Sequence, residues 1–198
     1  YRGLSMGALQ PYLRGERSGK VFGITFDDGY LNNLVNALPT LQWYGFSATC
    51  YAISGMLGQT NSWDLDKGVP PSPLMTALHL RQWVGGGQEV GAHTRHHVRL
   101  PTLDVVAASD EIVLCKTDLE QITGKAVEHF CYPYGEYGPE HVAMVQQAGY
   151  VSATTTRRGR SASGDPMLEL PRVPVLRRTS RPLLWWKLVS GYEDRRRS

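Results

Sequence analysis

Cysteine is scarce in this chain, and a long apolar run is missing. The 198 residues include three cysteines, Cys50, Cys115 and Cys131, and none of them forms a CxxC pair. An odd, scattered set argues against a disulfide framework or a cysteine zinc site, so we expect reduced, buried thiols. Because no run of about 18 apolar residues occurs, the sequence predicts no transmembrane segment.

Other absences narrow the class of protein further. No internal repeat, low-complexity segment or signal-peptide pattern stands out in the sequence. With 41% hydrophobic residues and a net charge of +3, the chain has the composition of a soluble globular domain that buries a large core. The sequence leaves the compartment open, either the cytoplasm or an association with the cell envelope.

Two adjacent carboxylates follow the first apolar run, which spans residues 21–24. The run reads as a buried strand, and Asp27 and Asp28 come at its carboxyl end, directly before the turn residue Gly29. Like charges held this close oppose ionisation of both groups, so the pair calls for a cation or a shared proton. The competing interpretation is a solvated surface turn, which is the usual setting of an isolated Asp-Asp pair.

Three histidines lie within five residues of one another, at His93, His96 and His97, after a second strand-like segment. Imidazole nitrogens suit a borderline-soft divalent ion. One Asp and two His leave coordination positions open for water and substrate, which is typical of a catalytic rather than a structural metal site.

At this point the chain resembles a known family, the polysaccharide deacetylases, also called NodB homology domains or family 4 carbohydrate esterases. Four segments match its motifs in order, between about Val21 and Val175. They are Thr25-Phe26-Asp27-Asp28-Gly29, then His93-Thr94 with His97 and Leu100, then Tyr132-Pro133-Tyr134-Gly135, and last Leu170-Pro171-Arg172-Val173-Pro174-Val175.

The resemblance implies a role for each matching residue. Asp27 corresponds to the general base, and Asp28, His93 and His97 correspond to the metal ligands. The backbone N–H of Tyr134 corresponds to the donor for the developing oxyanion. The implied reaction is metal-dependent hydrolysis of N-acetyl groups on an amino-sugar polysaccharide or glycolipid, with release of acetate. Zinc is the first expectation for the ion, and nickel, cobalt, iron or manganese would also accept this ligand set.

Two departures from the family pattern concern catalysis. The third motif commonly opens with an arginine that orients the base, and Cys131 stands there instead. The last motif commonly supplies a histidine as general acid, and no histidine follows His141. We therefore expect the leaving amine to be protonated by water at the metal or by Asp27. A glycan-binding domain with little turnover, or a hydrolase of another amide or ester, remains an alternative.

Side chains near the expected groove suggest how a sugar is held. Tyr30, Trp63, Tyr132 and Arg172 are the candidate substrate-binding residues. Trp63 lies in a long irregular segment, residues 54–72, of the kind that often serves as a functional loop. Core packing is the alternative for each ring, and it is the expectation for the helical residues Trp43 and Trp83.

Strand-like and helix-like segments alternate along the chain. This alternation predicts an α/β protein with a mainly parallel sheet. The resemblance narrows it to a distorted (β/α) barrel of the NodB type with about seven strands and the motifs at the strand carboxyl ends. We expect one catalytic domain over residues 1–198, with its motif core over residues 21–176 and a C-terminal helix and basic tail over residues 182–198.

The C-terminal part is strongly basic. Residues 157–198 hold eleven Lys or Arg against four Asp or Glu, and the tail includes Arg195, Arg196 and Arg197 beyond the pair Trp185-Trp186. A solvated face is the favoured interpretation, and peripheral contact with an anionic membrane is the alternative. Without a nucleic-acid motif, we expect an N-acetylated carbohydrate rather than nucleic acid as partner; the oligomeric state is open.

Overall fold

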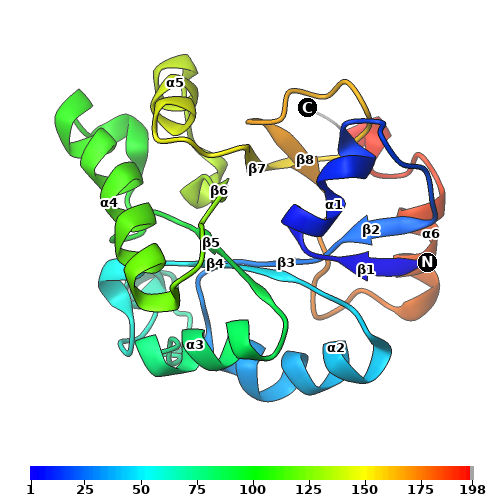
Figure 1. Cartoon of the computed structure of the whole chain (residues 1–198), viewed down its shortest axis with the longest axis horizontal. Helices are drawn as coiled ribbons and strands as arrows, with labels where there is room; N and C mark the ends of the chain where they lie inside the picture. Colours follow the sequence, from blue (N-terminus) through cyan, green and yellow to red (C-terminus); the bar gives the residue numbers. More distant parts are fainter. Residues whose placement is uncertain (197–198) are drawn as a thin grey trace.

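The computed structural model describes residues 1–196, so Arg197 of the basic tail and Ser198 lie outside the described residues. Its centre is a parallel sheet of six strands in the order β3-β4-β5-β6-β7-β8. The sheet curls into an open half-barrel with helices around it (Figure 1), which confirms the predicted distorted (β/α) barrel. The strands are β3 (Thr25–Phe26), β4 (Thr49–Ala52), β5 (Glu89–Ala92), β6 (His129–Cys131), β7 (Ser152–Arg158) and β8 (Leu170–Arg172).

A second, two-stranded parallel sheet extends the first edge. It consists of β1 (Arg2–Leu4) and β2 (Val21–Gly23). Ile24 joins the two sheets, because its N–H donates to the Leu4 carbonyl at 2.9 Å and its own carbonyl accepts from the Thr49 N–H at 2.9 Å. The predicted first strand is therefore real, but it is divided between two sheets before it delivers the carboxylates.

Helices cover the outer face of the sheet (Figure 1). They are α2 (Leu38–Tyr44), which continues a π-helical turn over Asn33–Ala37, α3 (Ala77–Gly85), α4 (Val105–Thr123) and α5 (Pro139–Gln147). Asp104 caps α4, since its side chain accepts from the Ala107 N–H at 2.9 Å, and Gly124 ends it at φ 65°. The main core lies between these helices and the sheet and includes Trp83, Ile112, Leu119 and Phe130.

Helix α3 begins at Ala77, because the side chain of Thr76 caps it by accepting from the His79 N–H at 3.3 Å. One expectation about this outer layer needs correction. The prediction that Trp43 packs in the core is wrong, since its side chain is 84% exposed. Trp83 is buried as expected.

Helix α1 (Met6–Leu13) closes the amino-terminal end of the half-barrel. The N–H of Met6 donates to Thr49 Oγ1 at 2.8 Å, and the N–H of Gly7 donates to Glu89 Oε2 at 3.0 Å. A Cβ atom at position 7 would collide with the Glu89 carboxylate, so glycine permits the close approach. Behind it, a smaller core forms inside the barrel from Met6, Leu13, Tyr51, Cys131 and Leu170. The amino-terminal end is thus filled, which leaves the carboxyl ends of the strands for a site.

The C-terminal helix α6 (Arg181–Val189) is tied to the barrel by buried charges. Glu193 is fully buried; its Oε1 lies 2.8 Å from Lys187 Nζ and its Oε2 accepts from Arg158 Nε at 2.7 Å. The helix exposes Trp185 and Trp186 to solvent. All three cysteines are free and buried, as predicted. No helix in the described part of the chain is long and apolar enough to cross a membrane.

Candidate metal centre and active site

Three of the predicted site residues meet at the carboxyl end of the sheet. Asp28 follows β3, and His93 and His97 follow β5. The Nε2 atoms of His93 and His97 each lie 3.4 Å from Asp28 Oδ1, and both imidazole rings are buried. Parallel strands bring their carboxyl ends to one edge of the sheet, which is why residues 65 positions apart in the sequence come together here.

The other ring nitrogens of both histidines are held by neighbours. His93 Nδ1 lies 2.7 Å from the Cys131 carbonyl oxygen, which only accepts, so Nδ1 is the donor. His97 Nδ1 lies 3.1 Å from Tyr134 Oη. Such contacts fix the orientation of metal-binding histidines and leave Nε2 free to act as the ligand. Burial also lowers the pKa of His97, which favours the neutral imidazole that binds a cation.

These donors suit one divalent cation. One ligand atom from each of Asp28, His93 and His97 lies within 4.8 Å of the others, and a carboxylate oxygen with two imidazole nitrogens is a common set for zinc and its neighbours. Asp27, His93 and Cys131 form a second set within the same limit. The first set fits better, because both oxygens of Asp27 are already hydrogen-bonded to a guanidinium.

Strained backbone is concentrated in the same segments. Within residues 1–196, the residues other than glycine with positive φ are Asp28 (71°), Thr94 (60°), His97 (55°) and Tyr134 (59°). Each such residue costs about 1–3 kcal/mol and persists where the surroundings enforce it, which happens most often at functional sites. Three of the four were predicted as site residues, and the fourth follows His93.

Arg172 holds Asp27 in a two-point contact. Its Nη1 donates to Oδ1 at 2.6 Å and its Nη2 donates to Oδ2 at 2.8 Å, while its Nε donates to the Thr155 carbonyl at 2.9 Å. Burial would raise the pKa of Asp27, but the guanidinium outweighs burial and holds the pKa below its ordinary value. The guanidinium also lies 3.4 Å from Cys131 Sγ. The small side chain at position 131 therefore leaves room for an arginine that arrives from β8.

Aromatic rings and cations surround the mouth of the site. The ring of Trp63 lies 4.4 Å from that of His97, centroid to centroid, and the ring of Tyr134 lies 4.6 Å from it on another side. Lys67 Nζ and Arg99 Cζ lie 4.9 and 4.3 Å from the centre of the Tyr134 ring. The irregular segment before α3 thus brings Trp63 to the site, as its composition suggested.

Of the two remaining substrate-binding candidates, Tyr30 lies at the site and Tyr132 does not. Tyr30 lies beside Asp28. Burial raises the pKa of its hydroxyl, and the negative charge of Asp28 raises it further. Tyr132 is not brought to the site, because its side chain is fully buried and its hydroxyl donates to the Leu168 carbonyl at 3.1 Å. Tyr132 is two positions after Phe130, so the alternation of side chains along β6 places both on the same face of the sheet. There the ring of Tyr132 packs against those of Phe130 and Tyr137.

The fold and the donor set define the class of protein: an open α/β barrel with a candidate metal centre at the carboxyl ends of its strands. The chain belongs to the polysaccharide deacetylase family, whose model matches residues 14–153. This result confirms the resemblance drawn from the four motifs.

One curated protein and two solved structures are similar to this chain. YxkH of Bacillus subtilis, whose name assigns it to the polysaccharide deacetylases, is 27% identical over 158 residues, which are 80% of this chain and 52% of YxkH. The chain therefore spans about half the length of this curated relative. The Streptococcus pyogenes deacetylase PplD, solved in complex with acetate, has a TM-score of 0.81 at 22% identity, over 96% of this chain and 80% of that one. IcaB from Ammonifex degensii has a TM-score of 0.81 at 22% identity, over 95% and 82%. These two likenesses show that the fold is of the NodB type.

Proposed function

We propose that the protein is a metal-dependent hydrolase that removes N-acetyl groups from an amino-sugar polysaccharide or glycolipid and releases acetate. The observation that supports it is the convergence of Asp28, His93 and His97 beside a carboxylate, Asp27, that is held in place by Arg172. A divalent ion bound there, zinc by first expectation, supplies a Lewis acid for the carbonyl oxygen and lowers the pKa of water. The proposal treats residues 1–198 as one catalytic domain.

Asp27 is proposed as the general base. Each carboxylate oxygen has two lone pairs, so Asp27 can accept a proton from water while it keeps both hydrogen bonds to Arg172. The proton then passes to the nitrogen of the breaking C–N bond, and water and the amide yield acetate and the free amine. This double use of Asp27 accounts for catalysis without a histidine in the last motif.

Arg172 is proposed as the positioning residue for the base. The prediction from the sequence placed it against the substrate, but both of its terminal nitrogens contact Asp27. It therefore substitutes for the arginine that the third motif lacks, and one of the two reasons to expect a domain without turnover is removed. The backbone N–H of Tyr134 is proposed as the oxyanion donor, and Trp63 and Tyr30 as substrate contacts.

The test is acetate release from N-acetylated chito-oligosaccharides by the purified protein. We expect activity that a chelator abolishes and that zinc, nickel, cobalt, iron or manganese restores to different degrees, with metal content measured in parallel. Asp28→Ala, which loses a ligand, is the matched inactive control. Glycan binding without acetate release would favour the binding domain. Release of acetate from an acetylated xylan, or ring opening of a cyclic imide, without acetate release from the chito-oligosaccharides would favour the hydrolase of a different bond.

A further inference from the structure

Helix α6 presents two large aromatic side chains to solvent. Residues four positions apart lie on the same side of a helix, so Trp185 lies one turn beyond Arg181. Trp186 likewise lies one turn beyond Pro182, and all four residues are exposed. Trp185 and Trp186 are 57% and 56% exposed, even though the ring of Tyr1 packs edge-on against Trp185 at 5.7 Å. The helix lies on the side of β1 and β2, away from α3, α4 and α5 (Figure 1).

The turn before α6 adds two exposed aliphatic side chains. Val175 is 62% exposed and Leu176 is 52% exposed. The turn is held in place, since the N–H of Leu176 donates to Thr179 Oγ1 at 2.9 Å. The Pro174 carbonyl accepts from Nζ of Lys187, a residue of α6, at 2.6 Å, which fixes the start of the turn against the helix. Exposed apolar side chains that are clustered in this way indicate an interaction surface.

The same segment carries positive charge without counter-ions. Residues 173–196 hold six Lys or Arg and two Asp or Glu. Both acids already form ion pairs, Glu193 with Lys187 and Asp194 with Arg160. By contrast, the side chains of three exposed arginines form no hydrogen bond or ion pair within residues 1–196; they are Arg177, Arg178 and Arg181. The exposed side of this segment is therefore cationic as well as apolar.

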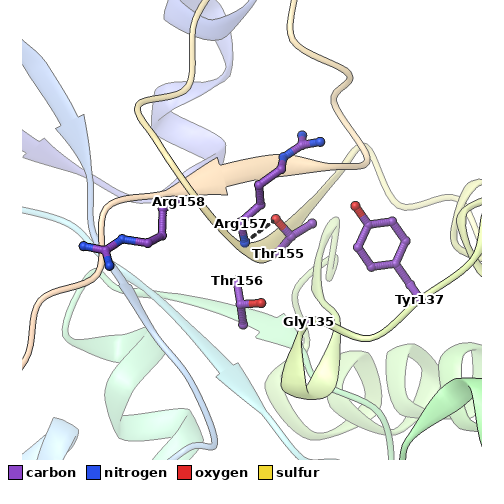
Figure 2. A pocket seen from close by; sticks show the side chains of 6 residues that line it. All are labelled: Gly135, Tyr137, Thr155, Thr156, Arg157 and Arg158. Atoms are coloured by element: carbon purple, nitrogen blue, oxygen red, sulfur yellow. Dashed lines mark hydrogen bonds between the residues drawn. The ribbon is translucent and has the colours of Figure 1, made fainter. Parts of the chain in front are cut away.

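Buried ion pairs fix this segment to the barrel. At the pocket drawn in Figure 2, the side chain of Arg158 extends away from the other labelled side chains, and its Nε donates to Glu193 Oε2 at 2.7 Å. Glu193 is fully buried, and its Oε1 lies 2.8 Å from Lys187 Nζ. The helix is therefore held in a fixed orientation, so little loss of conformational freedom opposes the docking of its exposed face.

An anionic lipid bilayer matches this combination of side chains. Tryptophan lies preferentially at the boundary between headgroups and acyl chains, where its ring is in an apolar layer and its N–H meets water. Arginines beside it bind the phosphates of anionic lipids. Nucleic acid would satisfy the arginines alone and would leave Val175 and Leu176 without an apolar partner.

We propose that this surface docks the protein on an anionic lipid bilayer. The surface consists of residues 175–178 with Arg181, Trp185 and Trp186. The indoles and the aliphatic side chains of the turn enter the boundary layer, and the arginines bind the headgroup phosphates. The sequence favoured a solvated face for this segment, but exposed tryptophans beside unpaired arginines favour the membrane. The inference does not depend on the proposed hydrolysis.

The experiment is co-sedimentation of the protein with vesicles of phosphatidylcholine, either alone or mixed with phosphatidylglycerol. We expect binding to the mixed vesicles only, and weaker binding at higher ionic strength. Tryptophan emission should shift to shorter wavelength when the mixed vesicles are added, because the indoles leave water. In the double variant Trp185→Ser/Trp186→Ser we expect about tenfold weaker binding and no such shift. The matched control is Trp43→Ser, at an exposed tryptophan on α2, which should keep both the binding and the shift.

A second double variant tests the charges and provides an answer even if the first fails to fold. Arg177→Gln/Arg178→Gln should weaken binding to the mixed vesicles about twentyfold, since each arginine near an anionic surface contributes about fivefold. The matched control is Arg81→Gln/Lys125→Gln, which removes two exposed cations, one on α3 and one after α4, and should change nothing.

Failure to bind either kind of vesicle, or binding that one of the two double variants leaves unchanged, would overturn the proposal. A single-stranded oligonucleotide tests the other class of partner. If it binds the protein and the mixed vesicles do not, the arginines belong to a nucleic-acid surface and the membrane proposal is wrong. A protein that binds anionic vesicles but releases no acetate from any glycan would retain this surface and overturn the hydrolase.

Discussion

Asp27 and Arg172 are joined by two hydrogen bonds of 2.6 and 2.8 Å across 145 positions of sequence. The pair links β3 to β8, the two edge strands of the curved sheet. A bidentate contact fixes the plane of the carboxylate as well as its charge, which a lysine at the same position would not do.

Replacement of this arginine should therefore impair the base. In Arg172→Lys we expect kcat/KM to fall by about a hundredfold, because a misplaced catalytic group costs that much. In Arg172→Met the lowering of the Asp27 pKa is lost and the raising by burial remains, so the acidic limb of the pH–rate profile should move to higher pH. Metal content should stay unchanged in both variants; an unshifted limb would argue that Arg172 does not act on Asp27.

Loss of the base itself should separate catalysis from metal binding. Asp27→Asn keeps the shape of the side chain but accepts no proton at neutral pH. We expect kcat to fall by about 10²–10⁴-fold, the usual contribution of general acid–base catalysis. Metal content measured by elemental analysis should match the wild type, since Asp27 is outside the preferred ligand set. A variant that also loses its metal would point to the second set, which includes Asp27.

The hydroxyl of Tyr134 should tune the metal through His97. Tyr134→Phe removes the partner of His97 Nδ1 at 3.1 Å and keeps the ring that packs against the imidazole. We expect metal affinity to fall about tenfold, as is typical when a hydrogen bond to a ligating histidine is removed. Competition with a fluorescent chelator measures it. Tyr44→Phe, at an exposed position, is the control, and equal affinity in both variants would contradict the role.

Trp63 should act on substrate affinity more than on chemistry. Its ring covers His97 at the mouth of the site, where it can stack on a pyranose. For Trp63→Ala we expect KM for chito-oligosaccharides to rise about tenfold with a smaller change in kcat. Initial rates over a range of oligosaccharide concentrations test this, with Trp185→Ala on the distant α6 as the control.

The buried charges of the C-terminal segment should make stability depend on pH. Burial would raise the pKa of Glu193, but its hydrogen bonds to Arg158 and Lys187 outweigh burial and lower it. A lowered pKa means that the ion pairs stabilise the fold above the ordinary range for Glu and are lost as the pH falls through and below it. In Glu193→Gln the free energy of unfolding should therefore fall less steeply as the pH is lowered into the acid range. Urea unfolding at pH 7 should also show a loss of about 3 kcal/mol, because Lys187 is left buried and unpaired. Arg181→Gln is the control, and it should change neither the pH dependence of stability nor the free energy of unfolding at pH 7.

The convergence of Asp28, His93 and His97 at one edge of the sheet could be predicted from the sequence, because it depends on where each residue lies relative to its own strand. Asp28 and His93 each follow a short apolar strand, and parallel strands place their carboxyl ends on one edge whatever their distance along the chain.

The contact between Asp27 and Arg172 could not be predicted in this way. It depends on how far the sheet curls, which decides whether the two edge strands approach each other, and no local pattern encodes that curvature. The signal that was available was the small residue Cys131 at the expected arginine position, together with an arginine in the last motif. Tyr132 was misplaced for a related reason, since the end of a strand does not reveal whether the next side chain faces the groove or the helices.

Helix α1 has a practical consequence for anyone who defines the limits of this domain. The family match begins at residue 14, one residue after that helix ends. A fragment that began at residue 14 would lose Met6 and Leu13 from the inner core and uncover Tyr51, Leu170 and Cys131 beneath Arg172, the proposed positioning residue. Water would then reach the candidate active site from the amino-terminal ends of the strands, so the shortest functional fragment should begin before the segment that matches the family.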